Sequence, residues 1–332
     1  MRFVVVADSF EKVKGGIENQ ARILFNLISS TSHKVVFIDY SELNKNTFSK
    51  GDVVIIEGIH RPKLFKLLFY RTPCYKIIFT HGSFYAWTDH PRVSFKGSGT
   101  NFLKIKRVFD LLFMKRILNK FDMIVTLSMR ESADLAKMFG IVQQKFFSLG
   151  NFSDEPPSSG EQDKVKDLPS GDYACYVGRL DERKNLIELL KAAAQQDIDV
   201  VMAGQDQGML NKLLNYCETH NFKKFHYEGV VDEATKFRII QNSRFAVIPS
   251  FFEGLPTFAI EAIKCKKNVI VTKNCYMDPH PCVIFTETNF EAISIAIEKA
   301  LVKTPCNIGY DSNNSLFERF LKTVEENVSK GE

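Results

Sequence analysis

The sequence predicts two successive α/β domains, each with a parallel sheet covered by helices. Along the first half of the chain, short runs of β-branched and aromatic residues alternate with amphipathic stretches, which is the pattern of a doubly wound sheet. A polar stretch at 151–172, which contains Pro156 and Pro157, interrupts this pattern, and the same alternation then resumes. The length of 332 residues also exceeds that of most single α/β domains.

The element order follows from these patterns. In the first half we predict strands at 3–7, 34–38, 53–57, 76–80 and 123–127, and helices at 17–29, 63–70, 102–119 and 128–139. Ser128, with Glu131 three residues later, has the form of a capping box at the start of the last of these helices. In the second half we predict strands at 173–178, 199–203, 224–227, 245–249 and 268–271, and helices at 186–195, 209–219, 233–241 and 257–264.

The predicted domains therefore occupy residues 1–152 and 172–314, and residues 153–171 link them. A helical period at 315–326 predicts a last helix within 315–332, which either completes the second domain or crosses back to the first.

Composition and charge exclude several classes of protein. The seven cysteines are an odd number without a CxxC pair, which argues against a zinc site or a disulfide framework and is typical of reduced thiols. The N-terminal run lacks the features of a signal peptide, and no segment has the roughly 18 uncharged apolar residues that span a bilayer. We expect a cytoplasmic protein, attached at most peripherally to the cytoplasmic face of the inner membrane. The net charge of +5 suits an anionic ligand, whereas no sequence pattern indicates nucleic-acid binding.

The first domain has two candidate ligand contacts in loops that follow strands, where open parallel sheets bind ligands. Gly15 and Gly16 precede a helix, and paired glycines there let the backbone approach an anion, although a flexible turn is the alternative. The loop is not GxGxxG, which argues against a nicotinamide or flavin dehydrogenase. His81 follows the strand at 76–80, either as a ligand contact or as a hydrogen-bonded structural histidine.

The second domain begins with two cations after its first strand. Arg179 offers a forked set of donors for phosphate oxygens, and Lys184 adds a point charge before the next helix. Exposed cations are common in any protein, so their position after the strand is what makes them candidates.

The strongest candidate segment follows the strand at 245–249. Glu253 precedes a turn made of Gly254, Leu255 and Pro256, and Glu261 lies about one turn into the next helix. Two carboxylates, the N–H groups of the turn and the positive end of a helix then face one pocket. This arrangement suits a polyol, because carboxylates accept hydrogen bonds from sugar hydroxyls. An acid that balances the helix dipole, plus a solvated glutamate, would explain either carboxylate separately but not the turn between them.

Over nearly the whole chain these motifs resemble those of the retaining glycosyltransferases of family four. Gly15 and Gly16 match the glycine loop of that family, and His81 with Gly82 matches its His-Gly element. Residues 178–180 and 184–185 match its basic signature, and residues 253–261 match its Glu-x7-Glu motif. The resemblance implies the GT-B fold, in which two Rossmann-like domains with parallel sheets face each other across a cleft. Residues 266–268 and 274–281 depart from the family, since they lack its usual glycine-containing turns.

The resemblance also implies roles for individual residues in binding a nucleotide-diphosphate sugar. Arg179 and Lys184 would contact the diphosphate, Glu261 the ribose, and Glu253 the donor sugar, with His81 over the reacting centre. The remaining implied donor contacts come largely from backbone groups: Gly15, Gly16, Gly229, Val230, Val231, Gly254, Leu255 and Pro256. These groups would stabilise the leaving diphosphate while the acceptor hydroxyl attacks the face of the sugar that the diphosphate leaves. The reaction would then need no protein nucleophile, cofactor or metal.

A metal role for Asp197 and Asp199 is disfavoured. Their Asp-x-Asp pattern resembles the metal motif of transferases with another fold, but it lies where a helix runs into a strand, at the wrong edge of the sheet.

The predicted function is therefore transfer of a hexose-type sugar from a UDP- or GDP-sugar to a hydroxyl of a glycan or polyprenyl-linked glycan. We expect this reaction in the synthesis of a bacterial surface polysaccharide such as O-antigen, capsule or exopolysaccharide. The alternatives are a nucleotide-sugar 2-epimerase of the same fold and a non-catalytic module that binds a sugar nucleotide or a partner.

Two stretches at 61–76 and 102–121 combine lysines and arginines with aromatic residues. Such helices either lie on an anionic membrane surface or cover a sheet with a solvated basic face.

Overall fold

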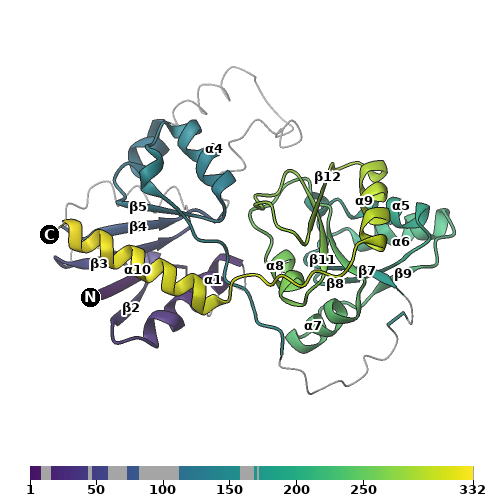
Figure 1. The fold of residues 1–332 in the computed structure, drawn as a ribbon, viewed down its shortest axis with the longest axis horizontal. Coiled ribbons are helices and arrows are strands. Elements are labelled where there is room, and N and C mark those ends of the chain that lie inside the picture. The colour runs from purple at the N-terminus through teal and green to yellow at the C-terminus, as the bar shows by residue number, and fades with distance from the viewer. Residues whose placement is uncertain are drawn as a thin grey trace. The chain divides into compact units, whose positions relative to one another are not determined.

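The computed structural model describes residues 1–8, 16–43, 47–58, 73–81, 112–157, 168–169 and 172–331. Within these ranges the chain divides into two compact units, one made of residues 1–152 and 312–332 and the other of residues 153–311 (Figure 1). The described part of each unit carries a parallel six-stranded sheet, which confirms the predicted α/β fold class. The predicted helix at 63–70, and residues 102–111 of the next predicted helix, lie outside the described residues.

The strands of the first unit are β1 (Arg2–Ala7), β2 (Lys34–Asp39), β3 (Asp52–Glu57), β4 (Tyr75–Phe79), β5 (Met123–Thr126) and β6 (Phe146–Ser148). They pair in the order β2-β1-β3-β4-β5-β6. Alternate residues such as Val6 and Ile78 pack on one face against Met114 and against Leu135 of α4 (Met129–Phe139). The residues between them point to the opposite face, which helices also cover, so both faces of this parallel sheet are buried.

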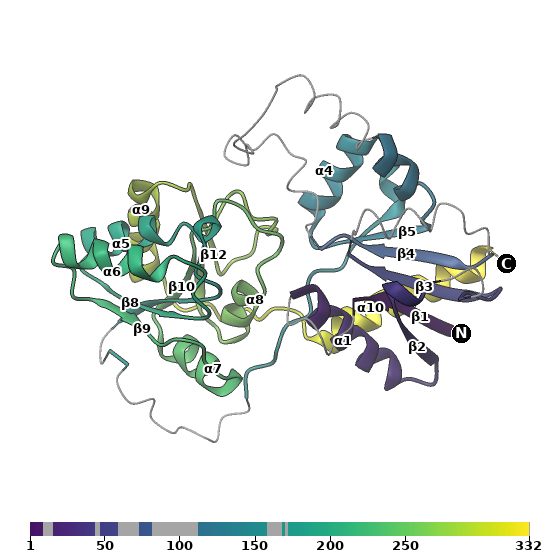
Figure 2. The ribbon, with the colours of Figure 1, turned by 180° about the vertical axis from the view of Figure 1, so that it is seen from behind.

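The opposite face of the first sheet is covered by α1 (Gly16–Ser29) and by the C-terminal helix α10 (Asn313–Gly331). The ring of Phe320 in α10 lies 5.6 Å from that of Phe79 at the end of β4. Arg319 donates a hydrogen bond to the Leu149 carbonyl at 2.8 Å. The last helix therefore packs on the first unit, along its sheet, as both ribbon views show (Figures 1 and 2).

The strands of the second unit are β7 (Tyr173–Val177), β8 (Asp199–Ala203), β9 (Phe225–Tyr227), β10 (Phe245–Ile248), β11 (Asn268–Thr272) and β12 (Val283–Thr286). They pair in the order β12-β11-β10-β7-β8-β9. One face packs against α5 (Leu186–Gln195), α6 (Leu210–Thr219) and α9 (Phe290–Val302) in a shared apolar core. The other face is covered by α7 (Glu233–Asn242) and α8 (Thr257–Lys264), as Figure 2 shows.

Two described strands and one described α-helix were not predicted. β6 and β12 are edge strands of three and four residues, too short for a clear period. In α9 the buried residues Ile293, Ala296, Ile297 and Ala300 have helical spacing, so this helix could have been found from the sequence.

The expectation that every cysteine is a free thiol is wrong for one pair. Cys282 and Cys306 form a disulfide, although 24 positions separate them in the sequence. The start of β12 and the segment after α9 bring them together, and no local spacing pattern reports such a contact.

The start of α4 holds the side-chain bond of the predicted N-cap. Ser128 accepts a hydrogen bond from the Glu131 N–H at 3.1 Å. The Glu131 carboxylate accepts from the Leu127 N–H and from the Thr80 hydroxyl, both at 2.7 Å. Glu131 is fully buried, so it ties α4 to the ends of β4 and β5.

No helix among the described residues is both long and apolar enough to cross a membrane.

Replacing Glu131 by Ala should therefore destabilise the first unit. The change strands the Leu127 N–H in the core and leaves the Thr80 hydroxyl only its longer bond of 3.3 Å to the Val125 carbonyl. The free energy of unfolding should therefore fall by about 2–4 kcal/mol. Asp134→Ala on the same helix is the matched control, because Asp134 is exposed, and its effect should stay within about 0.5 kcal/mol. Urea unfolding of both variants measures the difference, and equal losses would contradict the assignment.

Candidate functional site

Lys184 and Glu253 meet beyond the carboxyl ends of neighbouring strands of the second sheet. Lys184 ends the short helix η4 (Glu182–Lys184) after β7, and Glu253 lies in the loop after β10. The Lys184 Nζ is bonded to Glu253 Oε1, which also accepts from the Ser250 hydroxyl at 2.9 Å. The two side chains remain 14% and 21% exposed, so the pair is reachable from solvent. This edge therefore presents a cation and a carboxylate side by side.

The loop that carries Glu253 is held from two sides. Asn185 donates from Nδ2 to the Pro249 carbonyl at 3.0 Å, and the Phe251 N–H donates to the Arg183 carbonyl at 2.8 Å. On the other side, the Thr272 hydroxyl of β11 donates to the Ser250 carbonyl at 2.5 Å. These bonds fix the backbone on which Glu253 stands.

The loop between β11 and β12 adds a third support. Its Tyr276 N–H lies 3.2 Å from the Glu253 carbonyl and 3.1 Å from that of Gly254, and Cys275 forms a β-bridge with Glu253. Sequence reasoning missed Ser250, Thr272 and Tyr276 because their contacts join separate loops.

The turn at 254–256 leads directly into α8. Pro256 is the N-cap residue of α8, with φ −65°, so the helix begins at Thr257 as predicted. No side chain caps this helix. The first backbone N–H groups of α8 are thus suited to an anion, which the positive end of the helix also attracts.

Glu261 is buried rather than open to solvent. It is 5% exposed, and its Oε1 accepts from the Lys236 ammonium of α7 at 2.9 Å. Lys236 also pairs with Asp154 at 3.0 Å and with Glu233 at 2.5 Å. Sequence reasoning did not single out Lys236.

In this buried network, burial and ion pairing shift the pKa of each group in opposite directions. Burial raises the pKa of Glu261 to about 7, although the Lys236 charge opposes this shift. For Lys236 burial acts to lower the pKa, but Glu261, Glu233 and Asp154 outweigh it and raise the pKa. Lys236 is therefore a fixed positive charge beneath α8.

The remaining predicted residues of the second unit lie at the same edge of its sheet. Arg179 is exposed, and its carbonyl accepts from the Tyr176 hydroxyl at 2.9 Å. Gly229 adopts φ 68°, next to Val230, whose side chain is 77% exposed. A Cβ at Gly204 would lie 2.0 Å from the Gly178 carbonyl oxygen, so no side chain fits at this position. The backbone after β8 therefore packs directly against the backbone after β7.

In the first unit His81 is paired with a residue that sequence reasoning missed. Its Nε2 is bonded to Glu57 Oε2 at the end of β3, and the side chains are 5% and 1% exposed. His81 adopts φ 48°, a left-handed conformation uncommon for a non-glycine residue. The sequence feature that could have indicated this partner is Glu57 itself, an acidic residue at the end of the apolar run 53–57. Gly15 and Gly82 lie outside the described residues, and α1 begins at Gly16.

Asp197 and Asp199 lie at the start of β8, at the opposite edge of the sheet from Lys184. Their carboxylates pair with Lys224 at 2.9 Å and with His226 at 2.7 Å.

Comparison with known proteins places this site within a family model. Residues 159–301 match the model described as "Glycosyl transferases group 1", and both Lys184 and Glu253 fall inside the match. No curated protein sequence matches the chain.

Solved structures share the fold over the whole chain. The apo form of WaaB, a lipopolysaccharide outer core galactosyltransferase, has a TM-score of 0.68 at 12% identity and covers 98% of this chain and 99% of its own. Sucrose-phosphate synthase from Thermosynechococcus elongatus has a TM-score of 0.68 at 14% identity, over 99% of this chain and 94% of its own. WaaG, a glycosyltransferase involved in lipopolysaccharide biosynthesis, has a TM-score of 0.56 at 11% identity, over 91% and 90%. The family match and the shared fold together support a GT-B glycosyltransferase.

Proposed function

We propose that the chain is a retaining glycosyltransferase of family four, which transfers a hexose-type sugar from a UDP- or GDP-sugar to a hydroxyl of a glycan. The observation that carries the proposal is the Lys184–Glu253 pair at the carboxyl edge of the second sheet, inside the segment that matches the family model.

The proposed chemistry is stabilisation of charge. As the bond to the anomeric carbon breaks, the diphosphate gains negative charge, which Lys184, Arg179 and the N-terminus of α8 offset. Glu253 contacts the donor sugar, and the acceptor hydroxyl attacks on the face that the phosphate leaves. The reaction as proposed needs no protein nucleophile, cofactor or metal.

The nucleoside is proposed to lie along the same edge. Lys236 holds one oxygen of Glu261, which offers Oε2 to the ribose hydroxyls. The exposed Val230 side chain, with the backbone of Gly229 and Val231, packs beside the base. In the first unit, Glu57 orients His81 for the donor sugar, and the Gly16 backbone adds an anion contact.

The acceptor is proposed to be a polyprenyl-linked glycan of bacterial surface polysaccharide synthesis, since two of the structural neighbours are named for lipopolysaccharide enzymes. Such an acceptor suits a peripheral membrane protein. Most of the two basic stretches lies outside the described residues, but Lys115, Arg116 and Lys120 are exposed next to Leu112, which is 62% exposed.

A panel of uridine, guanosine and adenosine diphosphate sugars tests the proposed function. One nucleotide class should raise the melting temperature, and the product formed with that donor should keep the anomeric configuration of the donor. An inverted product would rule out family four, and the absence of any nucleotide-dependent shift would rule out a sugar-nucleotide site.

Lys184→Ala and Glu253→Gln should each lower kcat/KM by about 10²- to 10³-fold, because each removes a charge placed for the transition state. Lys212→Ala is the matched control, since Lys212 forms an exposed pair with Glu182 and should leave the rate within about twofold. Initial rates with the donor found above measure the effect, and circular dichroism checks that each variant folds. Full activity in either site variant would remove that residue from the proposal.

Flotation with liposomes tests the membrane attachment. The protein should float with vesicles that contain phosphatidylglycerol and should remain unbound with purely zwitterionic vesicles, because each surface cation contributes about 1 kcal/mol with anionic lipid. The double variant Lys115→Glu/Lys120→Glu should bind more weakly. Binding that is equal for both vesicle types and insensitive to salt would contradict electrostatic attachment.

A further inference from the structure

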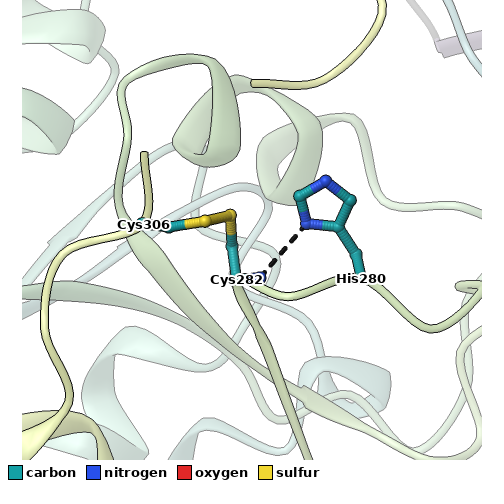
Figure 3. A group of neighbouring side chains, drawn as sticks. All are labelled: His280, Cys282 and Cys306. Atoms are coloured by element: carbon teal, nitrogen blue, oxygen red, sulfur yellow. Dashed lines mark hydrogen bonds between the residues drawn. A yellow bond between two sulfur atoms is a disulfide. The ribbon is translucent and has the colours of Figure 1, made fainter. Parts of the chain in front are cut away.

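We propose that His280, Cys282 and Cys306, with both cysteines reduced, form a binding site for a zinc-class divalent cation. The ligand atoms that these three side chains offer lie within 4.8 Å of one another. Figure 3 shows the imidazole turned toward the paired sulfurs. The cluster is formed by the end of the β11–β12 loop and the segment after α9, so only the folded second unit assembles it.

The donor set selects the class of metal. Two thiolates and one imidazole are soft and borderline ligands, which prefer zinc-class cations over the oxygen-seeking Mg²⁺ and Ca²⁺. The Cα atoms of the two cysteines are 5.2 Å apart, so rotation about the side-chain bonds can move the sulfurs to neighbouring corners of one tetrahedron. The described residues supply three ligands, and a water molecule takes the fourth position, as in zinc sites with three protein ligands.

The residues around the cluster are arranged in a way that suits a bound cation. Cys282 is fully buried and Cys306 nearly so, which shields a bound cation from competing water. His280 donates a hydrogen bond to the Gly309 backbone carbonyl, and a ring N–H that donates to a backbone carbonyl orients a metal-bound histidine and selects its tautomer. The Cys282 backbone N–H donates to His280 Nδ1 at 3.2 Å, and a cation bound at Nδ1 would replace that bond.

The disulfide and the metal exclude each other, because a sulfur in a disulfide carries no thiolate. Opening the site consumes two electrons and two protons, which convert the disulfide into two thiols. A phosphine reductant supplies the electrons and becomes a phosphine oxide with the oxygen of one water molecule. Each thiol then releases its proton as its thiolate binds the cation. The cluster thus has an oxidised state closed by a sulfur–sulfur bond and a reduced state able to bind metal.

The cluster lies at one end of the loop whose other end supports Glu253. Cys275 and Tyr276 contact the Glu253 backbone, and His280 and Cys282 follow four to seven positions later. A bound cation would therefore stiffen a loop that helps to place Glu253. This consequence, unlike the metal site itself, rests on the proposed function.

Zinc titration of the full chain tests the proposal. Protein reduced with the phosphine and freed of metal by a chelator should take up one equivalent of Zn²⁺ in competition with a chromophoric chelator, and native mass spectrometry should show one added zinc. Co²⁺ should give thiolate-to-metal charge-transfer bands. Cys306→Ser and His280→Asn should weaken zinc binding by more than about tenfold. Cys217→Ser is the matched control, since Cys217 is a half-buried free thiol elsewhere, and it should bind like the wild type.

Three outcomes would overturn the proposal: no stoichiometric zinc in the reduced protein, equal affinity in Cys306→Ser, or equal affinity in protein oxidised back to the disulfide. None of these readouts involves a sugar nucleotide, so failure of the metal site and failure of the proposed transferase activity are distinguishable.

Discussion

Parallel pairing of β7, β10 and β11 is the constraint on which the candidate site depends. Because these strands are neighbours and run in one direction, the loops that follow them leave the sheet at a single edge. Lys184 after β7, Glu253 after β10 and Tyr276 after β11 are far apart in sequence, yet Glu253 contacts both of the others there. The hydrogen bonds among these loops turn a set of flexible connections into one supported surface.

Two ion pairs of the second unit have opposite physical characters. Lys184 and Glu253 form a partly exposed pair, which is worth little in water and can exchange one partner for a ligand oxygen at low cost. Lys236 and Glu261 form a buried pair, which is costly to break because a charge would be left without a partner in the core. The first pair is thus suited to exchanging a partner for a ligand, whereas the second holds α8 in position against α7 and fixes the orientation of Glu261.

The first unit repeats the arrangement on a smaller scale. Glu57 ends β3, His81 follows the neighbouring strand β4, and Glu131 reaches the end of β4 from α4. In both contacts a buried carboxylate at the carboxyl edge of the sheet bonds to a residue that follows β4, Glu57 to His81 and Glu131 to Thr80. Polar residues at and after the ends of strands therefore serve both to hold the elements of a unit together and to line the edge where ligands of such sheets are found.

The sequence by itself determined the fold class, most of the strands and the segment that carries Glu253. These features are local: alternation, helical period and a glycine-proline turn are all visible within a few residues. It also placed Lys184, Arg179 and His81 at the carboxyl ends of strands, since that follows from element order alone. Tertiary structure decided the partners. Lys236 beneath Glu261, Glu57 beside His81, and the contact of Cys282 with Cys306 all join residues from separate elements. Such contacts depend on which helix covers which face of a sheet and how side chains pack there, and no pattern along the chain records that geometry.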